Sequence, residues 1–248
     1  MPDIARPLAQ VRDSVCAMMR IVRLKPKHTK HGPAVVQFRV AFVGTAWCIV
    51  PDRFLLTAHH VLNEGKPREP ADAFYAFTVP ANRDEAYCFP VIAFPHEDAE
   101  ADIAALEIGP PTAPGQHIPS APVTFSHPPD GSQVLTIGFP SPQIEAAQLD
   151  DAGRFLGGGR FFLKSHSNTG IVSAQYAISG KWFFEFNVGW HHGESGGPVF
   201  ALNPVAAFAI MQQYRNVDTP HGIFPGPHRG RSLEAVRQRI EQLGANVI

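Results

Sequence analysis

Short stretches in which apolar and polar residues alternate are the main regularity along this chain of 248 residues. Alternation of this kind places every second side chain on one face and is typical of β-strands. The pattern predicts strands at 15–24, 35–43, 45–50, 74–79, 86–94 and 102–108, and again at 161–165, 170–174, 182–188 and 205–213. Because these stretches are short and bounded by turn-forming residues, the sequence predicts an all-β protein.

Helical periodicity is confined to the two ends of the chain. A short helix is predicted near residues 8–15. Close to the carboxyl end, apolar residues recur at helical spacing between a potential N-cap at Ser232 and a stop at Gly244. The sequence therefore predicts a carboxyl-terminal helix within 231–248.

A proline-rich segment divides the chain. Residues 109–130 show no regular period, and prolines at this density exclude a helix or a central strand. We therefore predict an amino-terminal β-subdomain at 1–108, a linker at 109–130 and a carboxyl-terminal β-subdomain at 131–230. The glycine-rich stretch 141–159 is predicted to be a loop.

Composition excludes several classes of function. The net charge is −1, from 21 basic and 22 acidic residues, so no electrostatic argument favours nucleic acid or an anionic membrane as a partner. No apolar run is long enough to span a bilayer, and the amino terminus lacks the apolar segment of a secretory signal. The three cysteines are odd in number and far apart, which favours a reducing compartment. We expect a soluble, cytoplasmic protein.

One run of residues combines a nucleophile with unusual backbone freedom, Gly193-Glu194-Ser195-Gly196-Gly197-Pro198. A serine hydroxyl becomes an effective nucleophile when a base removes its proton, and the resulting oxyanion needs nearby donors. Glycines let successive N–H groups face one point and leave room for a substrate. A lone Gly-x-Ser-Gly would fit an ordinary turn equally well, but the full run resembles the nucleophile loop of trypsin-like serine proteases.

That family places a histidine and then an aspartate upstream, and both are found here. The segment Thr57-Ala58-His59-His60-Val61 is similar to the one that carries the family's histidine. The match makes His60 the base and puts His59 where alanine is usual. Neighbouring histidines leave a small ambiguity between the two.

The aspartate matches at Asp102, which opens the apolar stretch Asp102-Ile103-Ala104-Ala105-Leu106 much as the family's aspartate opens a strand. Glu97, Asp98 and Glu100 are nearby alternatives. We favour Asp102 because the strand after it would hold it in place, whereas the others belong to a run typical of a solvated loop.

The resemblance covers roughly residues 35–215 and is closest to the bacterial HtrA-like branch, whose segments are similar to 131–140 and 170–174. It implies two six-stranded Greek-key β-barrels, the chymotrypsin-like double barrel, with a carboxyl-terminal helix added. HtrA-like proteases usually carry a PDZ domain, and the chain ends too soon for one.

The resemblance also implies an activity. Ser195 would attack a peptide carbonyl, His60 would transfer the proton and Asp102 would orient His60. The N–H groups of Gly193 and Ser195 would hold the oxyanion. We expect a polypeptide substrate, no cofactor, no metal, and a dedicated protein partner or regulator of the kind that stand-alone domains of this family often have.

Further residues are implied as substrate-binding: Gly189, Trp190, His192, Gln212, Gln213 and Tyr214. No acidic residue stands near Gly189, so a preference for Lys or Arg is not supported. Glu194 replaces the aspartate or asparagine usual in the family, and we expect its carboxyl group to bond to the loop backbone or to His191 or His192.

Two other readings remain open. A trypsin-like fold can serve as a non-catalytic module that binds peptides or proteins. A metal site could use His59, His60, His191 and His192 among the 12 histidines, although adjacent histidines on a strand point apart and no ligand spacing supports a set.

Overall fold

A computed structural model describes residues 4–25, 27–29, 32–81, 83, 85–189, 191–219 and 222–248. For residues 27–29, 32–35, 213–219 and 223–225 it describes the backbone alone.

The first half of the chain forms a closed, six-stranded antiparallel barrel. Its strands are β1 (Val15–Arg23), β4 (Phe38–Val50), β5 (Phe54–Thr57), β6 (Ala73–Thr78), β7 (Tyr87–Asp98) and β8 (Ile103–Ile108), hydrogen-bonded in the order β1-β4-β5-β8-β7-β6. Pairing of β1 with β6 closes the barrel.

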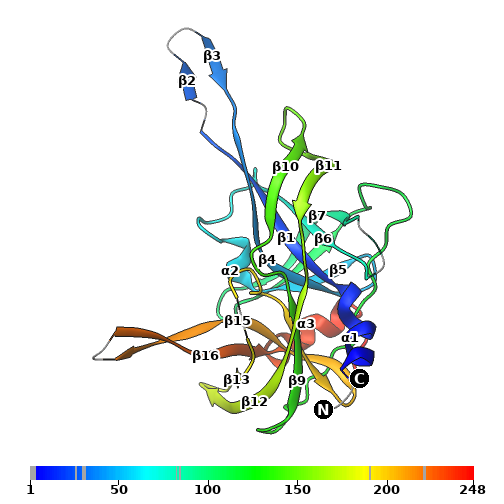
Figure 1. The fold of residues 1–248 in the computed structure, drawn as a ribbon, viewed down its shortest axis with the longest axis vertical. Coiled ribbons are helices and arrows are strands. Elements are labelled where there is room, and N and C mark those ends of the chain that lie inside the picture. Colours follow the sequence, from blue (N-terminus) through cyan, green and yellow to red (C-terminus); the bar gives the residue numbers. More distant parts are fainter. Residues whose placement is uncertain are drawn as a thin grey trace.

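The second half repeats this architecture. Its strands are β9 (Gln133–Gly138), β12 (His166–Ile178), β13 (Lys181–Phe186), β14 (Pro198–Leu202), β15 (Val205–Thr219) and β16 (Gly222–Ser232), in the order β12-β13-β16-β15-β14-β9. In Figure 1 the first barrel lies above the second. The expected chymotrypsin-like double barrel is confirmed.

Few residues are helical. The amino-terminal helix α1 spans Ala5–Val11, followed by a 3₁₀ turn at Arg12–Ser14, and α2 spans His59–Leu62. The carboxyl-terminal helix begins as a 3₁₀ turn, Leu233–Val236, and continues as α3, Arg237–Gln242. Ser232 is its N-cap, as expected, because the Ser232 hydroxyl accepts the N–H of Glu234 at 3.2 Å.

The structure corrects three details of the sequence prediction. The stretches 35–43 and 45–50 are not a strand pair, because they form the single thirteen-residue strand β4. The predicted loop 141–159 instead contains most of a hairpin, β10 (Gln143–Leu149) and β11 (Phe155–Phe162). Strand β16 was not predicted at all. A further short ribbon joins β2 (Lys27–Thr29) and β3 (Gly32–Val35).

Three apolar clusters account for the core: one inside each barrel, and a third that extends from the seam between the barrels to the hairpin of β10 and β11. Strand β8 is buried on both faces, with Ile103 and Ala105 in the cluster between the barrels and Ala104 and Leu106 inside the first barrel. This explains why its sequence is continuously apolar and not alternating. The seam between the barrels includes an edge-to-face contact of Trp47 with Phe200, their ring centroids 6.4 Å apart.

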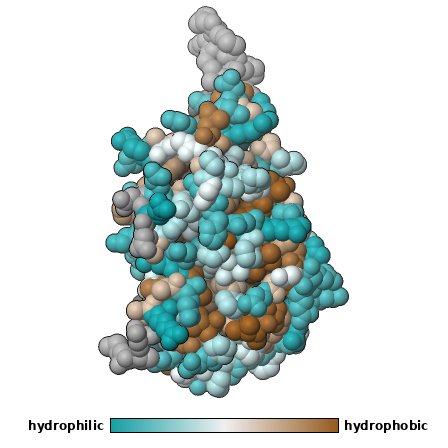
Figure 2. All heavy atoms as spheres, turned by 90° about the vertical axis from the view of Figure 1, so that its right-hand side faces the viewer, coloured by the Kyte–Doolittle hydropathy of each residue, from teal (hydrophilic) through white to brown (hydrophobic). Residues whose placement is uncertain are grey.

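On the face that carries α1 and α3, apolar and hydrophilic residues form small patches next to one another (Figure 2). Within the described ranges, none of the helices has the length and apolar character that crossing a bilayer requires.

A buried ionic network holds the loop that follows α2. The Arg20 side chain on β1 is 2% exposed, and its guanidinium donates to the carbonyl oxygens of Glu64, Lys66 and Pro67 at 3.2, 2.8 and 3.0 Å. Two further contacts, at 3.1 and 2.5 Å, reach Oδ2 of Asp72. Burial alone would raise the pKa of Asp72, but the hydrogen bond from the Glu69 N–H and the Arg20 guanidinium together lower it, so the pair is ionised.

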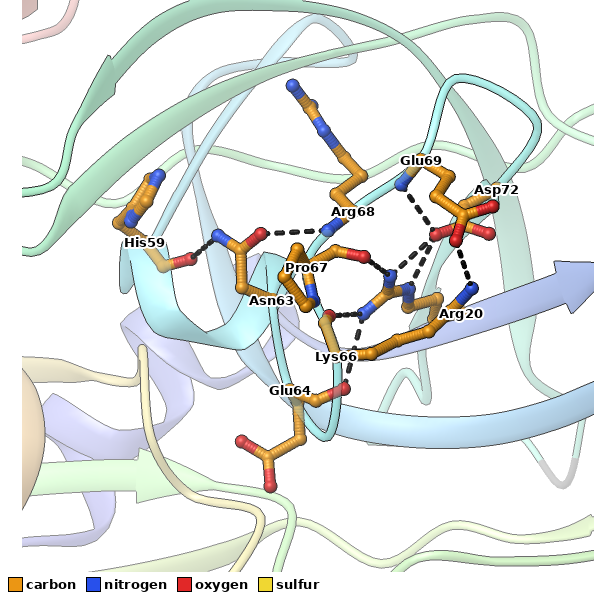
Figure 3. A network of polar contacts seen from close by, with 9 residues as sticks. All are labelled: Arg20, His59, Asn63, Glu64, Lys66, Pro67, Arg68, Glu69 and Asp72. Carbon is orange, nitrogen blue, oxygen red and sulfur yellow. Dashed lines mark hydrogen bonds and ion pairs between the residues drawn. The ribbon is translucent and has the colours of Figure 1, made fainter.

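The network continues to α2 through Asn63 (Figure 3). The Asn63 amide donates to the carbonyl oxygen of His59 at 3.3 Å and accepts the N–H of Arg68 at 2.9 Å. The carboxyl end of α2 is therefore tied to a fixed loop.

We expect Arg20→Met to lower the free energy of unfolding by about 3–5 kcal/mol, because it leaves a buried carboxylate without its cation. Arg53→Met is a matched control: Arg53 also pairs with a carboxylate, that of Glu107, but its side chain is 62% exposed. Arg53→Met should lower the free energy of unfolding by at most about 1 kcal/mol. Urea unfolding measures both, and equal losses in the two variants would contradict the role assigned to Arg20.

Candidate active site

His60 and Asp102 come together because two neighbouring strands end side by side. Strand β5 pairs with β8 in a register that matches Thr57 with Ala104. Helix α2 begins just after β5, and Asp102 directly precedes β8. The end of one strand thus delivers the histidine and the start of the other delivers the aspartate.

The Asp102 carboxylate holds both the backbone and the ring of His60. Its Oδ1 accepts the His60 N–H at 2.8 Å, and its Oδ2 lies 2.8 Å from Nδ1 of the ring. The Asp102 carbonyl oxygen accepts the His59 N–H at 3.2 Å. These acceptors satisfy the first amides of α2, and a carboxylate acceptor places the ring proton on Nδ1, so that Nε2 is the basic nitrogen. Asp102 has φ of 56°, a left-handed conformation that few non-glycine residues adopt.

His59 turns away from this pair. Its Nε2 lies 3.8 Å from Oε2 of Glu97, and Glu97 also accepts a 2.7 Å hydrogen bond from Arg68. The two adjacent histidines therefore serve different partners. Throughout the described residues, no group of three or more His, Cys, Asp or Glu is arranged to hold a metal ion.

The other two acidic alternatives also have partners of their own. Oδ1 of Asp98 accepts the N–H groups of Glu100 and Ala101, at 2.9 and 2.7 Å, and so closes the turn before Asp102. Glu100 forms an ion pair with Lys181.

The serine loop is fastened to the first barrel by Thr45 of β4. The Thr45 N–H donates to the carbonyl oxygen of Ser195 at 2.8 Å, and the Thr45 hydroxyl donates to that of Gly193, also at 2.8 Å. On the other side, the N–H of Gly196 donates to the carbonyl oxygen of Met211 at 2.8 Å. A Cβ at Gly196 would lie 2.9 Å from the Ala58 nitrogen, so only glycine allows this approach.

The Ser195 hydroxyl donates to the carbonyl oxygen of Gln212 at 2.9 Å. A hydroxyl has one proton, so the Ser195 proton is directed at the backbone and not at His60. The structure thus joins His60 to Asp102 and holds the Ser195 loop against strand β4 of the same barrel. The hydrogen bond from Ser195 to His60 is not formed.

Gln212 links the serine to the aspartate turn. Its side chain is buried, and the amide donates to the carbonyl oxygen of Ala101 at 2.8 Å, one residue before Asp102. The sequence suggested Gln212 only as a substrate-binding residue, and nothing in its local pattern indicates this bridge.

Glu194 is a buried acid next to Ser195. It is 1% exposed, and its Oε2 accepts the His191 N–H at 2.6 Å, which agrees with the expected bond to the loop backbone. Its Oε1 has no hydrogen-bond partner in the part of the chain that is described. Burial raises the pKa of Glu194 to about 7. A Cβ at Gly138 would lie 2.9 Å from the Glu194 Cβ, so a glycine there makes room for the glutamate.

The peptide between His192 and Gly193 has a defined orientation. The His192 carbonyl oxygen accepts the Ser141 N–H at 3.0 Å. In a planar trans peptide the N–H points opposite to the C=O, so the Gly193 N–H faces away from the 139–142 segment. Gly193 has φ of +100°, and a Cβ there would lie 2.6 Å from the Phe139 carbonyl oxygen.

The remaining predicted residues are less informative. Gly189 and His192 are exposed on the loop before Ser195. Trp190 lies outside the described residues, and for Gln213 and Tyr214 only the backbone is described, in β15.

His228, which the sequence did not suggest, pairs with Phe186 and Tyr214 across the sheet. Burial and the neighbouring His191 lower the pKa of His228.

Comparison with known proteins agrees with this fold. A search of curated proteins finds no match. Solved structures with a similar fold include the HtrA-type protease AlgW with a decapeptide, at 15% identity over 99% of this chain and 69% of that one, with a TM-score of 0.64. Another is Deg5, at 13% identity over 94% and 90%, with a TM-score of 0.58. The family model described as trypsin-like peptidase domain matches residues 44–203, well over half of the chain. The chain therefore belongs to the trypsin-like peptidase family.

Proposed function

We propose that this protein is a serine endopeptidase that hydrolyses peptide bonds through an acyl-enzyme, with His60, Asp102 and Ser195 as its triad. One observation carries the proposal: the Asp102 carboxylate contacts both the backbone and the ring of His60, at 2.8 Å each. A carboxylate in this position fixes the tautomer and orientation of the ring and stabilises the imidazolium that forms during attack.

The first step moves a proton from Ser195 to His60. The hydroxyl turns from the Gln212 carbonyl oxygen toward Nε2 of His60, and Oγ attacks the substrate carbonyl as the ring takes the proton. His60 then gives that proton to the leaving amine, and the C–N bond breaks to leave an ester on Ser195. Water, activated by His60, hydrolyses the ester and restores the serine.

The oxyanion of each tetrahedral intermediate needs hydrogen-bond donors, and we assign this role to the N–H groups of Gly193 and Ser195. The orientation of the His192–Gly193 peptide supports this assignment, because the Ser141 contact turns the Gly193 N–H away from the neighbouring loop. Removal of one such donor typically lowers turnover about 10²–10³-fold.

A polypeptide is the substrate in this proposal. The support is the fold shared with AlgW, whose structure contains a bound decapeptide.

A second candidate function is a non-catalytic module that binds peptides. The Ser195 hydroxyl bonded to Gln212 favours it, since a serine held there permanently would not attack a carbonyl.

A fluorophosphonate probe distinguishes the two functions. Wild-type protein should be labelled, Ser195→Ala should not be labelled, and His60→Ala should be labelled about 10³-fold or more slowly, because its serine lacks a base. His59→Ala is the matched control and should be labelled at nearly the wild-type rate. Folded wild-type protein that resists the probe would favour the binding module, and equal loss in both histidine variants would contradict the assignment of His60.

Glu194 makes stability depend on pH. Its pKa is about 7 in the folded protein, against 4.5 for an unperturbed glutamate. Between these two values the unfolded chain releases the proton and the folded chain keeps it, so stability falls as pH rises through this window and is level above it.

We expect the melting temperature of wild-type protein to fall between about pH 5 and about pH 8, and Glu194→Gln to remove most of that fall. A difference of about 2 kcal/mol in the free energy of unfolding between wild type and Glu194→Gln at the upper pH corresponds to a difference of about 4–8 °C in melting temperature for a domain of this size. Glu241→Gln, at an exposed position that pairs with Arg237, is the control and should keep the wild-type slope. The same slope in all three proteins would refute the role of Glu194.

A further inference from the structure

Gln212 occupies an irregularity in the pairing of β15 with β16. Its neighbours Met211 and Gln213 lie opposite consecutive residues of β16, so Gln212 is an extra residue that the register of β16 does not match. A bulge of this kind releases a residue from the ladder and redirects its side chain. Here the carbonyl oxygen accepts the Ser195 hydroxyl, and the side chain reaches from the second barrel to the first.

The oxygen that this side chain reaches belongs to the peptide in front of Asp102. The Gln212 amide donates to the Ala101 carbonyl oxygen at 2.8 Å. The Ala101 carbonyl and the Asp102 N–H share one planar peptide, so a donor that holds the oxygen also limits rotation about φ of Asp102. That angle is 56°, and a non-glycine residue keeps a left-handed conformation only where its surroundings enforce it.

Two other contacts hold the same turn. Oδ1 of Asp98 accepts the Ala101 N–H at 2.7 Å, and the Asp102 carbonyl oxygen accepts the His59 N–H at 3.2 Å. Both partners lie in the first barrel, whereas Gln212 lies in the second. Gln212 therefore ties the Asp102 turn to the half of the molecule that carries Ser195.

An uncharged amide suits this position. Gln212 is 8% exposed and Ala101 is 4% exposed, so water has little access to replace their hydrogen bond. The amide donates without placing a charge beside the residue that precedes Asp102. A lysine would also donate, but its cation would compete with His60 for the Asp102 carboxylate.

Gln116 makes a similar bond with a different consequence. Its side chain accepts the Cys88 N–H at 3.1 Å. Cys88 lies within β7 and pairs with β6, so the ladder fixes its conformation with or without Gln116. Ala101 instead lies in the turn between β7 and β8. Loss of the side chain removes a hydrogen bond in both cases, but it releases a turn only at Ala101.

We propose that Gln212 is a positioning residue, whose amide fixes the Ala101–Asp102 peptide and thereby keeps the Asp102 carboxylate against the backbone and ring of His60. Its effect on catalysis rests on the triad proposed above. The alignment of His60 with Asp102 can be measured without hydrolysis.

The Nδ1 proton of His60 reports this alignment in the full chain. In proton NMR spectra, an imidazole proton bonded to a carboxylate resonates downfield of the backbone amides, and its loss in His60→Ala assigns it. Wild-type protein should show the resonance. In Gln212→Met it should be absent or exchange with water at least about tenfold faster, because the released turn lets the carboxylate move off the ring.

Gln116→Met is the matched control. It also removes a bond between a side chain and a distant backbone group, yet it should keep the His60 resonance and its exchange rate. Both variants should melt about 2–8 °C below wild type. A difference in the resonance between them then reflects position and not stability.

Gln212→Glu separates the hydrogen bond from the packing. The new carboxyl group has the shape of the amide, but it can donate to the Ala101 oxygen only while it is protonated. Because burial raises the pKa of such a group, the variant should match wild type at about pH 5 and resemble Gln212→Met at about pH 8. The wild-type resonance should be present at both values. If Gln212→Met does not fold, this comparison decides alone.

Labelling by the fluorophosphonate probe measures the catalytic consequence. Gln212→Met should be labelled about 10–10²-fold more slowly than wild type, because misplacement of a catalytic group by about 1 Å can cost that much. Gln116→Met should be labelled at nearly the wild-type rate. Wild-type protein that resists the probe would count against the endopeptidase alone, since the resonance tests Gln212 independently.

Three results would overturn the role of Gln212. The first is a wild-type resonance and exchange rate in Gln212→Met, or the same loss in Gln116→Met. The second is a resonance in Gln212→Glu that does not differ between the two pH values. The third is a wild-type protein that lacks the resonance.

Discussion

The contact between the Asp102 carboxylate and the amino end of α2 is the constraint on which the site depends. Helix α2 has only four residues, too few to be stable alone, and its first amides are satisfied by an aspartate 42 positions away. The other end is held by Asn63 and by the loop around Arg20. A short, otherwise unstable element thus becomes a rigid support for the His60 ring, because polar groups from elsewhere hold it at both ends.

Two buried charges near the site are less completely hydrogen-bonded than the guanidinium of Arg20. Around Arg20, burial of a charge is matched by hydrogen bonds from all three guanidinium nitrogens. Glu194 has one unpartnered oxygen and Arg231 two unpartnered nitrogens within the described residues. Both lie beside residues of the proposed site: Glu194 precedes Ser195, and Arg231 lines a hollow that it shares with Ala101, the residue before Asp102.

The fold, and the proximity of His60 and Asp102, could be inferred from sequence because each signal is local. The strand that ends at Thr57 and the turn that precedes Ile103 carry their own patterns, and sheet pairing then brings His60 and Asp102 together. The hairpin of β10 and β11 was missed because its glycines conceal the alternation and its pairing is a matter of register. The Gln212 amide and the Ser195 hydroxyl could not be predicted either, since their partners are backbone oxygens that the fold alone supplies.

Thr45 has a consequence for how the molecule moves. It belongs to the first barrel, yet its amide and hydroxyl hold the carbonyl groups of Ser195 and Gly193, which belong to the second. The loop is therefore anchored to the same half that carries His60 and Asp102. For Ser195 to move away from His60 and Asp102, a slide or tilt of one half against the other would first have to break these two hydrogen bonds.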